Sequence, residues 1–314
     1  MRVQTSREGT VPVLRTVGLT KRYGRRLALA DLSLDVYGGR VYGFLGPNGA
    51  GKTTAINLVL GLIAPTAGHV ELFGLDTRAH LQQALRRTGS LLEGSPAYPD
   101  LSARDNLRIW GALSGGVTAK RMAEVLALVG LAGRAGDKVR AYSLGMRQRL
   151  ALAAALVHEP ELFILDEPTN GLDPAGIREV RELLRALAAV GKTVFVSSHL
   201  LSEVEQMCDE VAIIKEGRLI AHGAVADLTR RGEVLEMQVT DAQKAIPALQ
   251  ALDWVVSVSH DGANGIVVEA PRDRAWELSR ALAEQEVYIS EMRPREGTLE
   301  DFFMEVTAEE EKSG

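Results

Sequence analysis

The residues from Gly46 to Thr53 read Gly-Pro-Asn-Gly-Ala-Gly-Lys-Thr, which is the spacing of a phosphate-binding loop. Glycines at 46, 49 and 51 let the backbone wrap tightly, so that its N–H groups point at phosphate oxygens. A strand-like apolar run precedes the loop and a helical run follows it, and the helix adds its positive N-terminal end. Lys52 would reach the β- and γ-phosphates, and the Thr53 hydroxyl suits Mg²⁺. We therefore expect a bound nucleoside triphosphate rather than a chance glycine-rich turn.

Two acidic residues follow a second apolar run. Leu162 to Leu165 read as a buried strand, and Asp166 and Glu167 stand at its end, with Pro168 after them. A buried strand would deliver Asp166 to the Mg²⁺ shell and Glu167 to an attacking water. The competing interpretation is an acidic surface turn, which the four bulky apolar residues before the pair argue against.

A histidine follows a third run of this kind, Thr193 to Ser197, after one further serine. Ligands of open α/β sheets bind beyond the carboxyl ends of the strands, so His199 is placed to donate a hydrogen bond to a γ-phosphate. A lone histidine is usually structural, and only its position singles out His199.

Two further segments are ambiguous by themselves. Tyr142 to Gln148 read Tyr-Ser-Leu-Gly-Met-Arg-Gln, with Ser143 as a good N-cap for a helix. A helix N-terminus entered through small residues can bind an anion, but plain capping explains the pattern equally well. The segment from Gly171 to Pro174 reads only as a turn before a helix, with Asp173 as its N-cap.

The elements that must position these residues alternate between strands and helices from Val13 to about His222, which predicts an α/β fold. Strand signals vanish between roughly residues 101 and 158, where helical periods indicate an inserted helical subdomain. The remaining expected strands span 14–17, 32–36 and 211–214. The expected helices span 103–113, 119–129, 144–157, 174–190 and 200–208.

The order of expected strands and helices changes after Ala224. The order of segments becomes strand, helix, strand, strand, helix, strand, which is the ferredoxin-like pattern. We therefore expect a first domain over residues 1–224 and a small accessory domain over 225–314, closed by a helical turn from Leu299 to Val306.

Composition narrows the class of protein. The chain has 314 residues, of which 46% are hydrophobic, and a net charge of −5, which argues against a nucleic-acid partner bound through bulk charge. No apolar stretch approaches the roughly 18 to 20 residues of a membrane span. The N-terminus lacks the apolar core of a signal peptide, and Cys208 is the only cysteine. These features predict a cytosolic location.

Taken together, the motifs resemble the nucleotide-binding subunit of an ABC transporter over residues 13 to about 223. Gly46 to Thr53 match Walker A, Asp166 and Glu167 match Walker B with its catalytic glutamate, and Ser143 to Gln148 match the family signature. Asp173 falls in the D-loop and His199 in the switch histidine loop. Tyr23 falls where the family stacks an aromatic ring on adenine. Without the resemblance, Tyr23 is an unremarkable tyrosine at the end of a strand.

Two motifs depart from the family pattern. Glu93 takes the place of the usual Q-loop glutamine, so it can still offer an oxygen to Mg²⁺ but adds negative charge near the phosphates. In the signature, Leu144 and Met146 replace the usual glycine and glutamine, while Ser143 and Gly145 remain. These departures and the C-terminal domain resemble bacterial exporter ATPases related to bacitracin and daunorubicin resistance proteins.

The resemblance implies a P-loop core with an antiparallel β subdomain, an inserted helical subdomain and a ferredoxin-like C-terminal domain. It implies hydrolysis of ATP with Mg²⁺, by Glu167, Lys52 and His199, and metal binding by Thr53, Glu93 and Asp166. The expected partners are a second copy in a head-to-tail dimer and a membrane permease that holds the chain at the inner face of the membrane. The expected nucleotide contacts are Tyr23, Gly46, Pro47, Asn48, Gly49, Ala50, Gly51, Lys52, Thr53, Thr54, Ser143, Gly145 and Asp173.

The function that follows is an ATPase subunit that powers export of a drug, antibiotic or lipid-like compound. A second class is a soluble ABC ATPase that acts as a mechanical clamp. Repair clamps carry a long coiled coil between the Walker motifs and translation clamps carry two nucleotide domains, and this chain has neither feature. A GTPase switch is a third class, but the chain has no Asn-Lys-x-Asp guanine-reading motif.

Overall fold

The apolar strand before the phosphate-binding loop lies inside a six-stranded sheet. The sheet has the order β10-β9-β3-β8-β7-β6, and all neighbours are parallel except β10 and β9. Its strands are β3 (Val41–Leu45), β6 (Thr88–Leu91), β7 (Leu162–Asp166), β8 (Thr193–Ser198), β9 (Glu210–Lys215) and β10 (Arg218–Ala224). Every residue of β3, β7 and β8 is buried, as near-continuous apolar runs in a parallel sheet require.

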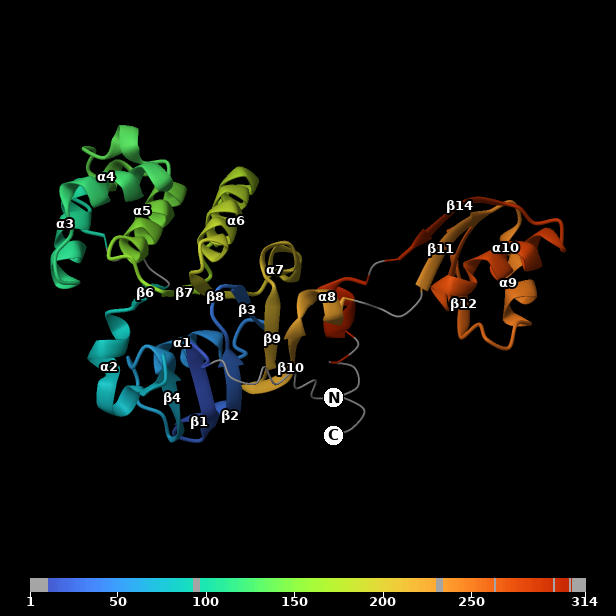
Figure 1. Cartoon of the computed structure of the whole chain (residues 1–314), viewed down its shortest axis with the longest axis horizontal. Coiled ribbons are helices and arrows are strands. Elements are labelled where there is room, and N and C mark those ends of the chain that lie inside the picture. Colours follow the sequence, from blue (N-terminus) through green and yellow to red (C-terminus); the bar gives the residue numbers. More distant parts are fainter. Residues whose placement is uncertain are drawn as a thin grey trace. The chain divides into compact units, whose positions relative to one another are not determined.

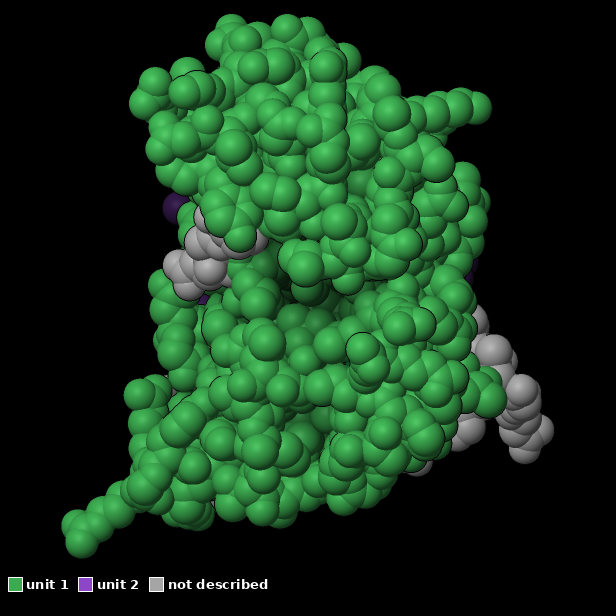
Figure 2. Space-filling view, turned by 90° about the vertical axis from the view of Figure 1, so that its left-hand side faces the viewer, with its two compact units in different colours: residues 1–225 green, residues 226–314 purple. Residues whose placement is uncertain are grey.

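This computed structural model describes residues 11–92, 97–229, 234–262, 264–295, 297–304 and 306. Contacts divide the chain into two units, residues 1–225 and 226–314 (Figures 1 and 2). The space-filling view shows a hollow across the middle of the face that the first unit presents (Figure 2).

A second, antiparallel sheet of the first unit has the order β2-β1-β4-β5. Its strands are β1 (Leu14–Tyr23), β2 (Arg26–Val36), β4 (Ala67–Leu72) and β5 (Leu75–Asp76). Buried residues of both sheets and of helix α1 (Lys52–Val59) form one hydrophobic core that includes Leu34, Ile56 and Ile164. The sequence predicts only short pieces of β1 and β2 and does not predict β4, because β4 is held by pairing with the distant β1 rather than by local apolar alternation.

Helices replace strands between β6 and β7, as expected. Helices α3 (Ala103–Leu113), α4 (Ala119–Leu128) and α5 (Leu144–Leu156) agree with the predicted spans to within one residue, and two short 3₁₀ turns, Ala132–Arg134 and Val139–Ala141, lie between α4 and α5. Ser102, Thr118 and Ser143 cap their N-termini through side-chain oxygens. Figure 1 shows these helices grouped together within the first unit, which also contains α2 (Thr77–Leu85), α6 (Pro174–Ala189) and α7 (Leu201–Met207).

The second unit has the ferredoxin-like order that the sequence predicts. Strands β11 (Val234–Val239), β12 (Ser257–Asp261), β13 (Gly265–Glu269) and β14 (Ile289–Pro294) form a sheet of order β12-β13-β11-β14, and every adjacent pair in it is antiparallel. Helices α9 (Ala242–Gln250) and α10 (Ala275–Ala283), the latter preceded by a 3₁₀ turn (Arg272–Arg274), share a core with the sheet. Helix α8 (Val225–Leu228) stands at the division between the units, and residues 299–304 are helical.

No helix in the described part of the chain combines the length and the apolar character that crossing a membrane requires.

Candidate functional site

The loop from Gly46 to Gly51 is shaped by close backbone approaches. A Cβ atom at Gly46 would lie 2.4 Å from the carbonyl oxygen of Ile214, so only glycine fits there. Gly51 caps α1 in the left-handed conformation with a φ of 107°, and a Cβ on it would lie 2.6 Å from the carbonyl oxygen of Ala28. No side chain caps the N-terminus of α1, so its first N–H groups are available to an anion.

Lys52 is the first residue of α1 and is only 6% exposed. Its Nζ donates a 2.7 Å hydrogen bond to the Gly46 carbonyl and lies 3.4 Å from Glu167 Oε1. A buried ammonium with three donors needs several acceptors, and here the loop and an acid supply them. The contact joins the phosphate-binding loop to the end of β7.

Ser197 connects the two acids at the end of β7. Its hydroxyl donates a 2.5 Å hydrogen bond to Asp166 Oδ1 and accepts a 3.0 Å hydrogen bond from the Glu167 backbone N–H. Parallel pairing places Ser197 directly beside Asp166, so the register of β7 and β8 creates this contact. Glu167 has a φ of 49°, an uncommon conformation for a residue other than glycine, and such strain clusters at functional sites.

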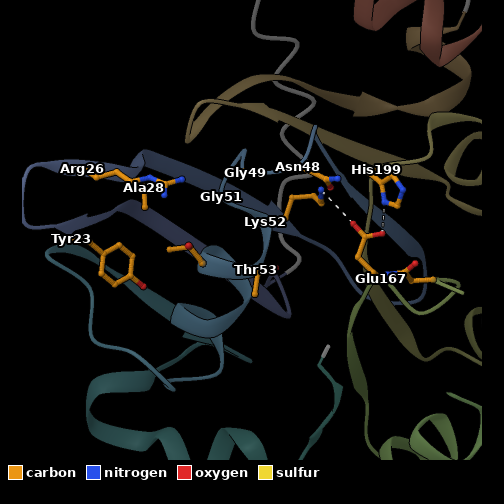
Figure 3. Close-up of a pocket in the computed structure, with 12 residues that line it drawn as sticks. Tyr23, Arg26, Ala28, Asn48, Gly49, Gly51, Lys52, Thr53, Glu167 and His199 are labelled. Carbon is orange, nitrogen blue, oxygen red and sulfur yellow. Dashed lines mark hydrogen bonds and ion pairs between the residues drawn. The ribbon is translucent and has the colours of Figure 1, made fainter. Parts of the chain in front are cut away.

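Glu167 also contacts the histidine that follows β8. Its Oε2 lies 2.8 Å from His199 Nδ1, and its side chain is 16% exposed. Figure 3 shows Lys52 and His199 approaching the same carboxylate from opposite sides. The structure therefore brings together three of the residues that the sequence singles out, although they come from three separate strand ends.

We expect Ser197→Ala to destabilise the protein because the buried Asp166 carboxylate would lose its only recorded hydrogen-bond donor in the described structure. A buried acceptor without a partner costs about 1 to 3 kcal/mol of the free energy of unfolding. Urea denaturation would measure this loss. The matched control is Ser198→Ala, since Ser198 is almost as buried and, within the part of the chain that the structure describes, its hydroxyl only accepts from the Leu200 N–H. Equal losses in the two variants would contradict a specific role for the Ser197 bridge.

These residues border a cleft of about 590 Å³. The lining includes predicted nucleotide contacts and three residues that the sequence analysis misses, Arg26, Ala28 and Asn170. Figure 3 draws the twelve residues of the lining, which are Tyr23, Arg26, Ala28, Asn48, Gly49, Gly51, Lys52, Thr53, Thr54, Glu167, Asn170 and His199. Gly46, Pro47 and Ala50 belong to the loop but are not in this lining. The cleft runs from an exposed aromatic ring, Tyr23, to the Lys52–Glu167–His199 group (Figure 3).

A divalent cation fits the acid at the end of β7. Asp166 Oδ2 is buried and has no hydrogen-bond partner within the described structure, so it is an acceptor that a cation would satisfy. The described residues contain no group of three His, Cys, Asp or Glu side chains suited to a metal. Magnesium is typically held by one or two protein oxygens together with substrate phosphates, which matches Asp166 and the Thr53 hydroxyl. Glu93, the third expected ligand, lies outside the described residues.

Three expected nucleotide contacts do not join this cleft. Of the described residues, Ser143, Gly145 and Asp173 are absent from its lining. Ser143 Oγ accepts from the Met146 N–H and Asp173 Oδ1 accepts from the Gly176 N–H, so each caps a helix as predicted.

The turn before α5 and the turn before α6, which carry these two capping residues, are in contact. A Cβ at Gly171 would lie 2.6 Å from Leu144 Cδ2, and one at Gly145 would lie 3.4 Å from Leu172 Cδ2. The signature-like turn and the D-loop-like turn of one chain therefore pack together, through residues that do not line the cleft.

Comparisons with known proteins identify the family of this chain. A family model described as "ABC transporter" matches residues 29–170. The bacitracin transport ATP-binding protein BcrA of Bacillus licheniformis is 41% identical over 298 residues, which cover 94% of this chain and 97% of that protein. The linearmycin resistance ATP-binding protein LnrL of Bacillus subtilis is 34% identical over 306 residues, which cover 94% of this chain and 98% of that protein. A dimeric ATP-binding cassette with ADP and phosphate bound matches with a TM-score of 0.63 and 26% identity, over 68% of this chain and 98% of that one.

Proposed function

This chain belongs to the ATP-binding subunits of ABC transporters, which hydrolyse ATP to drive transport. We propose that two copies of the chain share their ATP sites. We also propose that a membrane permease bound to them exports an antibiotic, drug or lipid-like compound. The observation that carries the proposal is the division of the site. One chain assembles the cleft around Lys52, Glu167 and His199 but leaves Ser143 and Gly145 outside it. A solved relative is a dimer with ADP and phosphate bound, which supports completion by a second copy.

In this proposal the loop, Lys52, Glu167 and His199 have distinct tasks. The amides of the loop and of the first turn of α1 hold the phosphates, and Lys52 exchanges its bond with the Gly46 carbonyl for phosphate oxygens. Glu167 polarises the attacking water, and His199 orients that carboxylate and donates to the γ-phosphate. Thr53 and Asp166 would hold Mg²⁺, which would neutralise charge on the phosphates. Glu93 is proposed to join the metal shell, on the basis of the resemblance alone.

Ser143 and Gly145 of the second copy complete the site in this proposal. The N-terminus of α5 carries the positive end of that helix, so it can close over the γ-phosphate held by the first chain. Asp173 lies beside this turn through the Leu144–Gly171 contact and would approach the same interface. ATP thus acts as the link between the two copies, and hydrolysis releases them.

The proposed cargo and location follow from the relatives. Two relatives that match nearly the whole chain are named for bacitracin transport and for linearmycin resistance. We propose that this chain works at the cytoplasmic face of the membrane, bound to the permease that carries the compound. A soluble mechanical clamp is the competing function, and none of the relatives described above favours it.

Affinity purification of the tagged chain from native membranes tests transport against the clamp. We expect a polytopic membrane protein to co-purify, and disruption of the chain's gene to lower the tolerance of the cell to the antibiotic that this permease carries. Recovery without any membrane protein, together with unchanged tolerance to a panel of peptide and lipid-like antibiotics, would contradict the transport function.

The shared site is tested by Gly145→Asp in a Glu167→Gln background. An acid in the first turn of α5 suits the helix N-terminus, so folding is preserved, but it would repel the γ-phosphate held by the other copy. Light scattering with ATP should show a dimer for Glu167→Gln and a monomer for the double variant, while both bind ATP. Dimers in both cases would exclude the proposed contact.

A further inference from the structure

Arg26 lies beside the aromatic ring at one end of the cleft. It begins β2 and pairs with Tyr23, the last residue of β1, across a tight turn made of Gly24 and Arg25. Residues directly opposite each other in an antiparallel pair carry their side chains on the same face of the sheet. Both side chains line the cleft, whereas Arg25 at the turn does not.

Strand β2 leads from this ring toward the phosphate-binding loop. Ala28 is two residues further along the strand, lines the same cleft, and brings its carbonyl oxygen against Gly51 at the start of α1. Figure 3 shows the Arg26 side chain extending toward Ala28. Arg26 thus lines the cleft on the strand that leads from Tyr23 to the start of α1.

The positive charge of Arg26 has no partner among the described residues. Its guanidinium forms no hydrogen bond or ion pair with the described residues, and the side chain is exposed. Lys52, the other cation of the lining, already has the Gly46 carbonyl and Glu167 as partners. A free guanidinium offers five N–H donors in a planar fork, which is the geometry that binds phosphate oxygens in pairs.

We propose that Arg26 binds the α-phosphate of the nucleotide. The inference rests on the proposed function, in which the base stacks on Tyr23 and the β- and γ-phosphates lie at Lys52. In a nucleotide spanning these two ends, the ribose and α-phosphate pass along the part of the cleft that Arg26 and Ala28 of β2 line. Because the α-phosphate is common to ATP and ADP, Arg26 holds both nucleotides, while Lys52 and the partner copy distinguish the triphosphate.

The test compares Arg26→Ala with Arg25→Ala, which removes the same charge one residue away. Calorimetric titration would measure dissociation constants for ATP, ADP and GTP, with a second series for Arg26→Lys. We expect Arg26→Ala to weaken all three by about tenfold or more and by similar factors, since a hydrogen bond between charged groups is lost. Arg26→Lys should recover part of the affinity, because an ammonium keeps the charge without the fork. Arg25→Ala should change each constant less than twofold.

Other outcomes would overturn the inference. Loss of ATP affinity without loss of ADP affinity would place the contact at the γ-phosphate, and loss for ATP but not GTP would place it on the base. Equal constants for Arg26→Ala and Arg25→Ala would remove Arg26 from the site. If the unchanged protein bound none of the nucleotides, both this inference and the proposed function would fail, whereas wild-type binding with no Arg26 effect would leave the function standing. Circular dichroism of each variant checks folding.

Discussion

Glu167→Gln should reduce ATP hydrolysis by about 10²- to 10⁴-fold, the range expected when a general base is removed, while ATP binding is kept. The amide has the shape of the carboxylate, so the chain should fold as before. It cannot accept the proton of the attacking water, nor hold the same charged contacts with His199 and Lys52. With hydrolysis blocked, the two copies should stay joined through their shared ATP. The measurements are phosphate release at saturating ATP and gel filtration with ATP and Mg²⁺.

The matched control for this substitution is Glu182→Gln, which changes an exposed acid on α6 that is not in the cleft lining. It should hydrolyse ATP at the wild-type rate and show no lasting dimer. A Glu167→Gln protein that still hydrolyses ATP at more than about a tenth of the wild-type rate would remove Glu167 from the role of base. A protein that is inactive but remains monomeric with ATP would instead contradict the shared site.

The functional residues at the strand ends are predictable from the sequence because buried parallel strands appear in it as continuous apolar runs. Strands β3, β7 and β8 are buried along their whole length, so each reads as an apolar run; β7 and β8 end in polar residues, and β3 is followed by the glycine-rich loop. Parallel pairing then brings those ends to one edge of the sheet, and the register of β3 with β8 and of β7 with β8 confirms that arrangement. Lys52, Glu167 and His199 therefore meet as the motifs predict.

The Tyr23 end of the cleft carries no such signal. Arg25 and Arg26 are adjacent and identical in type, and only the pairing of Tyr23 with Arg26 decides which of them lines the cleft. Sequence alone does not place the turn to within one residue, and a shift of one residue moves a side chain to the opposite face. Strand β4 is missed for a related reason, because it exists through its pairing with β1 rather than through its own composition.

The bridge between Asp166 and Glu167 is also invisible in the sequence. Ser197 is one of two adjacent serines, and each is compatible with the end of a buried strand. The parallel register sets Ser197 beside Asp166 and directs Ser198 to the Leu200 N–H instead. Hydrogen-bond partners across a sheet thus depend on register, which local residue preferences do not define.

Lys52→Ala should raise the dissociation constant for ATP by roughly 10- to 150-fold, which corresponds to about 1.5 to 3 kcal/mol for hydrogen bonds of a charged group. The effect should be larger for ATP than for ADP, because the Lys52 side chain lies at the Glu167 end of the cleft, where the terminal phosphate would be attacked. Lys52→Arg should not restore binding, since the ammonium is buried against the Gly46 carbonyl and a planar guanidinium needs more room. Lys120→Ala, at an exposed position of α4, is the control and should leave both constants unchanged. Titration of ATP and ADP into each variant measures these dissociation constants. If Lys52→Ala weakened the binding of ATP and of ADP equally, Lys52 would not contact the terminal phosphate. If it left both affinities unchanged, Lys52 would not belong to the phosphate site.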